Sequence, residues 1–161
     1  MHETYHVRIE KDALVFSAGH FITFDGDVCE RLHGHNYRVT AEVAGPLDEN
    51  HYVVDFIALY DGLRKIVDRL DHRMLLPTEH PRIRVTTDER EACATFEDRR
   101  WIFPLCDCAL LPVANTTAEL LARHIAVELR STLLARGARP TRITISVDEC
   151  YGQIGVCTLR E

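Results

Sequence analysis

The chain has 161 residues, of which 46% are hydrophobic and 27% charged, so we expect one globular domain spanning residues 1–161. Its 25 acidic and 19 basic residues give a net charge of −6, which argues against general nucleic-acid binding. No apolar run is long enough to span a membrane, and no basic-then-apolar leader opens the chain. We therefore expect a cytoplasmic protein with reduced cysteines and no membrane contact.

Residues 5–20 and 33–45 have the apolar–polar alternation of β-strands. One face of the first strand carries Leu14, Phe16, Ala18 and His20. On the second strand, the apolar face consists of His33, His35, Tyr37, Val39, Ala41 and Val43, and Gly45-Pro46 ends the run.

His20, His33 and His35 are candidate metal ligands. Residues i and i+2 of a strand project from the same face, so His33 and His35 point together, and His20 can join them from a neighbouring strand. Three neutral imidazoles with an open fourth position are typical of a catalytic zinc site. An HxH pair alone is also compatible with ordinary hydrogen-bonded histidines. The third histidine, with Cys29 and Glu30 beside the pair, favours zinc.

Two helices are expected in the middle of the chain. Asp55 has the position of an N-cap before an apolar stripe of Phe56, Leu59, Tyr60, Leu63, Ile66, Val67 and Leu70. Thr116 to Glu119 matches a capping box for a second helix that runs to about Arg136 and ends at Gly137.

The remaining segments complete an α+β pattern. Residues 141–149 alternate again, and residues 155–160 form a last short strand. Between the helices, apolar and charged stretches alternate in residues 77–113, which predicts an inserted hairpin. The order strand, strand, helix, helix, strand, strand predicts a four-stranded antiparallel sheet with both helices on one face.

Glu149 is in phase with Ile143, Ile145 and Val147, which places a carboxylate on the apolar face of its strand. A buried carboxylate is costly unless it is hydrogen-bonded. Two interpretations are open from the residues alone: the strand ends here and Glu149 is solvated, or its oxygens accept hydrogen bonds from a ligand.

Four motifs together resemble the 6-pyruvoyl-tetrahydropterin synthase and 6-carboxytetrahydropterin synthase family. They are Phe16-Ser-Ala-Gly-His20, the run CERLHGHNY from Cys29 to Tyr37, Leu70-Asp71-His72, and Val147-Asp148-Glu149. The resemblance covers nearly the whole chain, apart from residues 77–113. It implies the tunnelling fold, in which protomers join their sheets into a homotrimer or a stacked homohexamer with active sites between chains. Such pairing also covers exposed sheet edges.

The resemblance also implies a zinc-dependent lyase that acts on 7,8-dihydroneopterin triphosphate. Glu149 would bind the pterin, and Asp71 and His72 would form a relay with the Cys29 thiol. Without the resemblance, Asp71-His72 is simply a charged helix end, where adjacent side chains do not bond each other. Thr116 and Thr117 are candidate pterin contacts, although a helix cap explains them as well.

The sequence leaves two products open, because it matches the motif patterns of two groups of relatives. The spacing C-x-x-x-H-G-H resembles the branch that makes 6-carboxytetrahydropterin for queuosine. Glu30 also satisfies E-x-x-H-G-H, the pattern of relatives that cleave the side chain to 6-hydroxymethyl-dihydropterin for folate, so a bifunctional enzyme is a further alternative. A non-catalytic zinc- or pterin-binding oligomer is the alternative from another class. The acid–base residues argue against it, because a pure binder does not need them.

Overall fold

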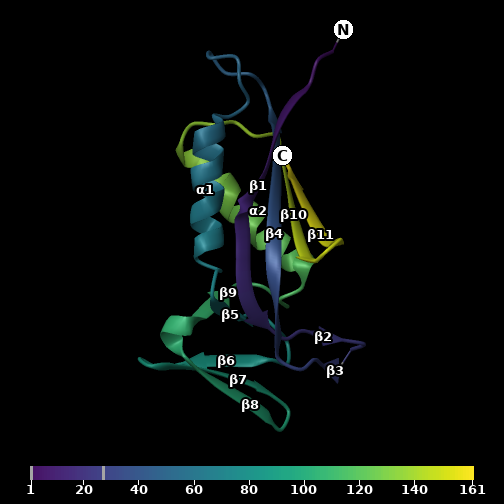
Figure 1. Cartoon of the computed structure of the whole chain (residues 1–161), viewed down its shortest axis with the longest axis vertical. Coiled ribbons are helices and arrows are strands. Elements are labelled where there is room, and N and C mark those ends of the chain that lie inside the picture. Colours follow the sequence, from purple (N-terminus) through teal and green to yellow (C-terminus); the bar gives the residue numbers. More distant parts are fainter. Residues whose placement is uncertain (1, 27) are drawn as a thin grey trace.

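The main sheet is built around two long antiparallel strands, β1 (Tyr5–His20) and β4 (His33–Gly45). The computed structural model describes residues 2–26 and 28–161. Strand β10 (Arg142–Cys150) pairs with β4, and β11 (Gln153–Arg160) pairs with β10, both antiparallel (Figure 1). The four strands expected from the sequence are therefore present.

Strand β1 changes phase in its middle, because its register against β4 shifts between Glu10 and Val15. Ile9 is buried on one side of the irregularity and Leu14 on the other, although a regular strand would place these two residues on opposite faces. The shift keeps both halves of the long strand facing the core, and it sets the phase that turns His20 inward.

The sheet is larger than four strands. In the part of the chain that the structure describes, it has six, in the order β11-β10-β4-β1-β5-β9. The two additional strands are short, run parallel to their neighbours, and are β5 (Arg73–Pro77) and β9 (Cys108–Leu111). The expected purely antiparallel sheet is thus a mixed one. Four of the five residues of β5 are buried, so this strand has no alternation that a sequence pattern can detect.

Helices α1 (Phe56–Asp68) and α2 (Ala118–Ala135) lie on the same side of the sheet, as expected (Figure 1). Asp55 is the N-cap of α1, and its carboxylate accepts from the backbone N–H of Ala58 at 2.8 Å. The cap of α2 is one residue later than the capping box predicted. Its N-cap is Thr117, because the Thr116 side chain is fully buried below the helix and bonds elsewhere.

The segment expected as an inserted hairpin forms a separate three-stranded antiparallel sheet, within the described residues. Its strands are β6 (Arg84–Thr87), β7 (Glu91–Phe96) and β8 (Arg99–Pro104). The charged stretches of the segment are its two turns. A 3-10 turn, η1 (Leu105–Asp107), then leads into β9. In Figure 1 this small sheet lies at the end of the molecule where β1 finishes and β4 begins.

Two hydrophobic clusters hold these layers together. The larger lies between the main sheet and the helices and includes Phe16, Tyr37 and Leu121. The smaller joins the inserted sheet to the short pair β2 (Thr23–Phe24) and β3 (Val28–Cys29), and includes Phe21 and Cys29. Neither helix of the described chain is long and apolar enough to cross a membrane.

Candidate metal centre and acid–base groups

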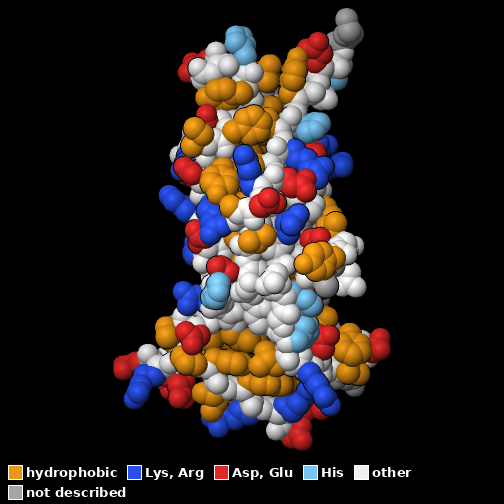
Figure 2. All heavy atoms as spheres, viewed as in Figure 1, with side chains coloured by type: hydrophobic (Ala, Val, Ile, Leu, Met, Phe, Trp, Pro, Cys, Tyr) orange, Lys and Arg blue, Asp and Glu red, His pale blue; other side chains and the backbone are white. Residues whose placement is uncertain are grey.

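The three histidines predicted as ligands meet at the junction of the two sheets. His20, the last residue of β1, is the register partner of His33, the first residue of β4, and His35 follows on the same face. One ring nitrogen from each of the three lies within 4.8 Å of the others. Figure 2 shows histidine side chains just above the apolar area at the lower end of the molecule. Residues of two neighbouring strands thus form one cluster.

Backbone carbonyls fix the tautomers of two of these rings. Nδ1 of His20 donates to the carbonyl of Thr116 at 2.9 Å, and Nδ1 of His33 donates to the carbonyl of Arg31 at 2.9 Å. The proton of each neutral ring is therefore on Nδ1, and each Nε2 presents a lone pair. The two Nε2 atoms are only 3.1 Å apart.

Two lone pairs at this distance repel each other unless a cation lies between them. Ligand nitrogens of a tetrahedral zinc with bonds of about 2.0 Å are about 3.3 Å apart, so the spacing fits a shared metal ion. Such outer hydrogen bonds to carbonyls also orient metal-binding imidazoles in general. The chemistry of the donor set therefore fits a divalent metal.

The environment keeps His20 neutral. Burial, which has the largest effect, and the neighbouring His33 and His35 together lower the pKa of His20 to about 4, although the hydrogen bond to Thr116 raises it. A metal ligand must be deprotonated, so this ring is ready to bind at neutral pH.

Glu149 lies beside the cluster. Its Oε1 is 3.4 Å from Nε2 of His20 and 3.7 Å from Nε2 of His35, and its side chain is 23% exposed. Burial raises the pKa of the Tyr37 phenol, and the adjacent Glu149 carboxylate raises it further. The carboxylate thus lies on the apolar face of β10, as its phase predicted, with oxygens partly open to solvent.

Cys29 and Glu30 point in different directions. Cys29 is 7% exposed and lies in the smaller hydrophobic cluster, and burial raises the pKa of its thiol while Arg99 partly opposes this. Oε2 of Glu30 lies 3.7 Å from Nδ1 of His33 and has no hydrogen-bond partner within the described residues. The chain by itself therefore brings the carboxylate, rather than the thiol, to the histidines.

Asp71 and His72 form a bonded pair, contrary to the expectation for adjacent residues at a helix end. Helix α1 ends at Asp68, and His72 adopts a left-handed backbone with φ of 56° that turns its ring toward Asp71, so that Nδ1 is 2.9 Å from Oδ2. Asp71 also accepts from the N–H of Ser17. Although burial raises it, the hydrogen bonds from Ser17 and His72 hold the pKa of Asp71 below its usual range.

His72 of this pair lines a cleft of about 600 Å³, together with Asn36, His33 and His35. The His72 ring is 84% exposed. In the described part of this single chain its ion-pair partner is Asp71, and nothing joins it to Cys29.

Thr116 and Thr117 have structural partners in the chain. The Thr116 hydroxyl donates to the carbonyl of Phe21 at 3.3 Å, and the Thr117 hydroxyl accepts from the N–H of Leu120 at 3.5 Å. Thr116 therefore supports the metal centre through its carbonyl, a role that the side chain gave no reason to expect. Arg99, which contacts the Cys29–Glu30 backbone, was also missed, because 70 residues separate it from Cys29.

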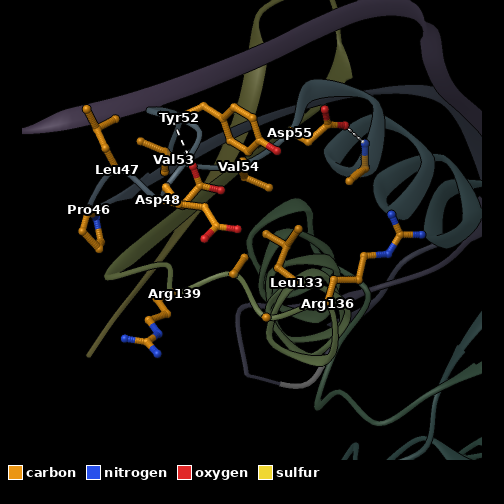
Figure 3. A pocket seen from close by; sticks show the side chains of 14 residues that line it. Pro46, Leu47, Asp48, Tyr52, Val53, Val54, Asp55, Leu133, Arg136 and Arg139 are labelled. Atoms are coloured by element: carbon orange, nitrogen blue, oxygen red, sulfur yellow. Dashed lines mark hydrogen bonds between the residues drawn. The ribbon is translucent and has the colours of Figure 1, made fainter.

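A second hollow lies at the opposite end of the molecule. It measures about 580 Å³ and lies between the loop after β4 and the end of α2, where Asp48, Tyr52, Leu133, Arg136 and Arg139 line it (Figure 3). Because β4 runs 13 residues between this hollow and the histidines, the two are about 40 Å apart. None of the acid–base residues named above lines it.

Comparisons with known proteins identify the family of this chain. The family model described as 6-pyruvoyl tetrahydropterin synthase matches residues 8–158. A protein of Methanocaldococcus jannaschii named putative 6-carboxy-5,6,7,8-tetrahydropterin synthase is 32% identical over 146 residues, 89% of this chain and 88% of that protein. Solved structures of 6-pyruvoyl tetrahydropterin synthase from Plasmodium vivax and Plasmodium falciparum superpose with TM-scores of 0.89. They are 26% and 28% identical to this chain, and each match covers 99% of this chain and 100% of the other. The chain therefore belongs to the 6-pyruvoyl tetrahydropterin synthase family.

Proposed function

We propose that this chain is a zinc-dependent lyase that converts 7,8-dihydroneopterin triphosphate and water to 6-carboxytetrahydropterin, with loss of triphosphate and release of the two outer side-chain carbons as acetaldehyde. The observation that carries the proposal is the pair of Nε2 lone pairs of His20 and His33, 3.1 Å apart and next to the Glu149 carboxylate. The names of similar proteins support the product, since the relatives from Methanocaldococcus jannaschii and Aquifex aeolicus are named 6-carboxy-5,6,7,8-tetrahydropterin synthases. The matching family model names the 6-pyruvoyl product instead.

Glu149 is the proposed anchor of the pterin ring. A carboxylate accepts two parallel hydrogen bonds, which matches the amino and ring N–H donors of a pterin. The partial burial of Glu149 supports this role, because a hydrogen bond in a partly desolvated site discriminates strongly between ligands. The proposed site also includes Thr116 and Thr117, which lie between His20 and the start of α2.

Zinc bound by His20, His33 and His35 would supply Lewis-acid chemistry, which lowers the pKa of hydroxyl groups on the pterin side chain. The Asp71–His72 pair then serves as a proton carrier, because Asp71 orients the ring and stabilises its cationic form. Cys29 is the proposed acid–base thiol. Since its pKa is raised in the single chain, the thiolate needs a nearby base, and the exposed His72 of a neighbouring chain is the proposed source.

We further propose that the active enzyme is a homotrimer or a stacked homohexamer. Strand β11 is at one edge of the main sheet, and Ile154 and Val156 on it are more than half exposed. Tyr151, in the turn before β11, is fully exposed. An uncovered, apolar edge strand is a liability that pairing with a neighbouring chain removes.

The test is to incubate zinc-loaded protein with 7,8-dihydroneopterin triphosphate and identify the products by mass spectrometry. Formation of 6-carboxytetrahydropterin or 6-pyruvoyl-tetrahydropterin supports the proposal. Tight binding without any conversion would instead favour the non-catalytic pterin-binding oligomer, and no turnover of any dihydropterin refutes the enzyme.

One observation favours a second candidate function, cleavage of the side chain to 6-hydroxymethyl-dihydropterin. Within the described residues, Oε2 of Glu30 is buried without a hydrogen-bond partner, 3.7 Å from Nδ1 of His33. Buried polar atoms normally have a partner, so this position favours a functional role for the carboxylate. Two solved structures of the Plasmodium vivax enzyme carry substitutions of a glutamate described as a catalytic residue. Glu30 is the corresponding candidate in this chain.

Separate Cys29→Ala and Glu30→Gln variants distinguish the two functions. If Cys29 is the base, its substitution abolishes the 6-carboxy or 6-pyruvoyl product and the glutamine variant keeps it. If Glu30 is the base, 6-hydroxymethyl-dihydropterin disappears in the glutamine variant alone. Loss of one product in each variant would identify a bifunctional enzyme.

A further inference from the structure

An arginine of the inserted sheet holds the backbone that carries both candidate bases. From the start of β8, Arg99 donates through Nη2 to the carbonyl of Cys29 at 2.8 Å and through Nη1 to the carbonyl of Glu30 at 3.5 Å. Its guanidinium also lies 5.3 Å and 5.4 Å from the ring centres of Phe96 and Trp101. A planar fork that stacks on rings and binds two acceptors is fixed far more tightly than a lysine would be.

The two residues that Arg99 holds cannot both face the metal centre. Cys29 is the last residue of β3 and Glu30 follows it directly, and neighbouring side chains along a strand point to opposite sides. In the structure, Cys29 lies in the smaller hydrophobic cluster and Glu30 lies next to His33. Bringing the thiol to the histidines requires the backbone here to rotate, and rotation breaks the hydrogen bonds to Arg99.

The same short segment also orients a metal ligand. The carbonyl of Arg31, one residue beyond Glu30, accepts from Nδ1 of His33, and the N–H of Glu30 donates to the carbonyl of Ile22 at 2.8 Å. Three successive carbonyls are thus engaged, two by Arg99 and one by His33. The inserted sheet therefore connects directly to the geometry of the site.

We propose that Arg99 is a positioning residue that fixes the Cys29–Glu30 segment and selects which of the two side chains faces the histidine cluster. The inference deepens the proposed function and rests on it for its catalytic consequence. With Arg99 in place, the Glu30 carboxylate lies beside His33, on the Nδ1 side of its ring, and the Cys29 thiol is sheltered in the smaller hydrophobic cluster. Without Arg99, the segment rotates more freely. The fraction of product whose formation depends on Cys29 then rises relative to the fraction that depends on Glu30.

The first test measures the sheltering of Cys29 directly and needs no turnover. Purified protein is treated with iodoacetamide, and the alkylation of the Cys29 peptide is followed by mass spectrometry. We expect the rate at Cys29 to rise about tenfold in Arg99→Ala, as loss of one charged hydrogen bond predicts, with a smaller rise in Arg99→Lys. The lost positive charge cannot cause the rise, because Arg99 lowers the pKa of Cys29 and its removal makes the thiol less reactive.

Two controls separate positioning from simple unfolding. Arg100→Ala changes the next residue of β8, whose exposed side chain contacts Cys93 instead of the Cys29–Glu30 segment, so the rate at Cys29 should stay as in the parent protein. In the Arg99 variants, Cys93 on β7 reports on the integrity of the inserted sheet, and its alkylation rate should not change. An unchanged Cys29 rate in Arg99→Ala, or an equal rise at Cys93, overturns the proposal.

The second test follows the reaction. In Arg99→Ala we expect kcat to change while the KM for the pterin stays within about twofold, because Arg99 holds the catalytic segment and does not touch the pterin anchor. Among the products, the fraction that depends on Cys29 should increase, and Arg99→Lys should restore part of the original ratio. A shift in KM with an unchanged kcat and product ratio contradicts the assignment. If the parent protein turns over no dihydropterin, the proposed function fails, and the alkylation result still decides the role of Arg99.

Discussion

The carbonyl of Thr116 accepts a hydrogen bond from Nδ1 of His20 at 2.9 Å, across 96 residues of chain. It ties the last residue of β1 to the segment just before α2, and it leaves Nε2 of His20 as a lone pair directed at His33. Because Thr116 also donates to the carbonyl of Phe21, the connection is held at two points. The histidine cluster is therefore part of the connection between the sheet and the helix.

The first prediction concerns the metal. We expect one zinc ion per chain, and His33→Ala should weaken its binding by more than about a hundredfold, beyond the loss typical of outer-sphere partners. Zinc should also raise the thermal stability of the parent protein, since it separates the facing lone pairs of His20 and His33. Metal analysis after dialysis and a thermal melt with and without zinc check both points. A stoichiometric zinc in His33→Ala would show that the ligand set is wrong.

The second prediction concerns the Asp71–His72 pair. Asp71→Asn keeps an oxygen that can accept from Ser17 but removes the charge that stabilises the His72 cation, so kcat should fall by about a hundredfold to ten-thousandfold. Steady-state kinetics and circular dichroism measure activity and folding together. The matched control is Asp68→Asn at the end of α1, where the carboxylate pairs with Arg64 in a surface contact, and it should leave kcat unchanged.

The third prediction concerns pH and His80. Its Nδ1 accepts from the N–H groups of Arg82 and Ile83 at 2.9 Å and 2.8 Å, while Nε2 bonds to the Thr23 hydroxyl. Burial lowers the pKa of His80, and Arg82 lowers it further. The folded state therefore favours the neutral ring. The resulting contribution of His80 to the free energy of unfolding is complete above the unfolded pKa of about 6.5 and is lost as the pH falls below that value.

Urea unfolding at pH 7.5 and at pH 5.5 tests this linkage in the parent protein and in His80→Asn. The Asn side chain can accept the same backbone N–H groups without titrating in this range. The free energy of unfolding should therefore fall less on acidification in the variant than in the parent. Equal falls in both proteins would assign the acid sensitivity to other groups.

The fourth prediction concerns the contact between β11 and α2. A Cβ added at Gly155 would lie 2.5 Å from the backbone of Ala118 and Glu119, so Gly155→Ala should lower the free energy of unfolding by about 1–3 kcal/mol. Gly62→Ala in α1 is the matched control, because its Cβ would meet side-chain methyl groups, of Thr132 at 3.2 Å and of Leu129 at 3.7 Å, instead of backbone, and the helix gains from alanine. Urea unfolding compares the two variants. An equal loss of unfolding free energy in both would mean that the backbone around Gly155 is no more crowded than around an average glycine.

The sequence by itself determined the parts of this protein that depend on local periodicity. Alternation in β4 placed His33, His35 and Tyr37 on one face, and the phase of β10 placed Glu149 on the face of Ile143 and Ile145. The helical spacing after Asp55 and the glycine at 137, with φ of 84°, defined the helices. These features could be predicted because each depends on residues within a few positions of one another.

Tertiary structure alone decided the features that depend on distant contacts or on exceptions to a period. Phe56, counted in the apolar stripe of α1, is the first residue of the helix and is 57% exposed. Strand β5 is buried almost throughout and has no alternation to detect, and the left-handed residue His72 pairs with Asp71 only because the chain turns back onto β1. Thr116 and Arg99 act on residues between 69 and 96 positions away, through contacts to backbone carbonyls that no side-chain pattern encodes. The histidine ligands follow from strand geometry, whereas their tautomers, and the choice of Glu30 over Cys29 beside them, follow from how the layers pack.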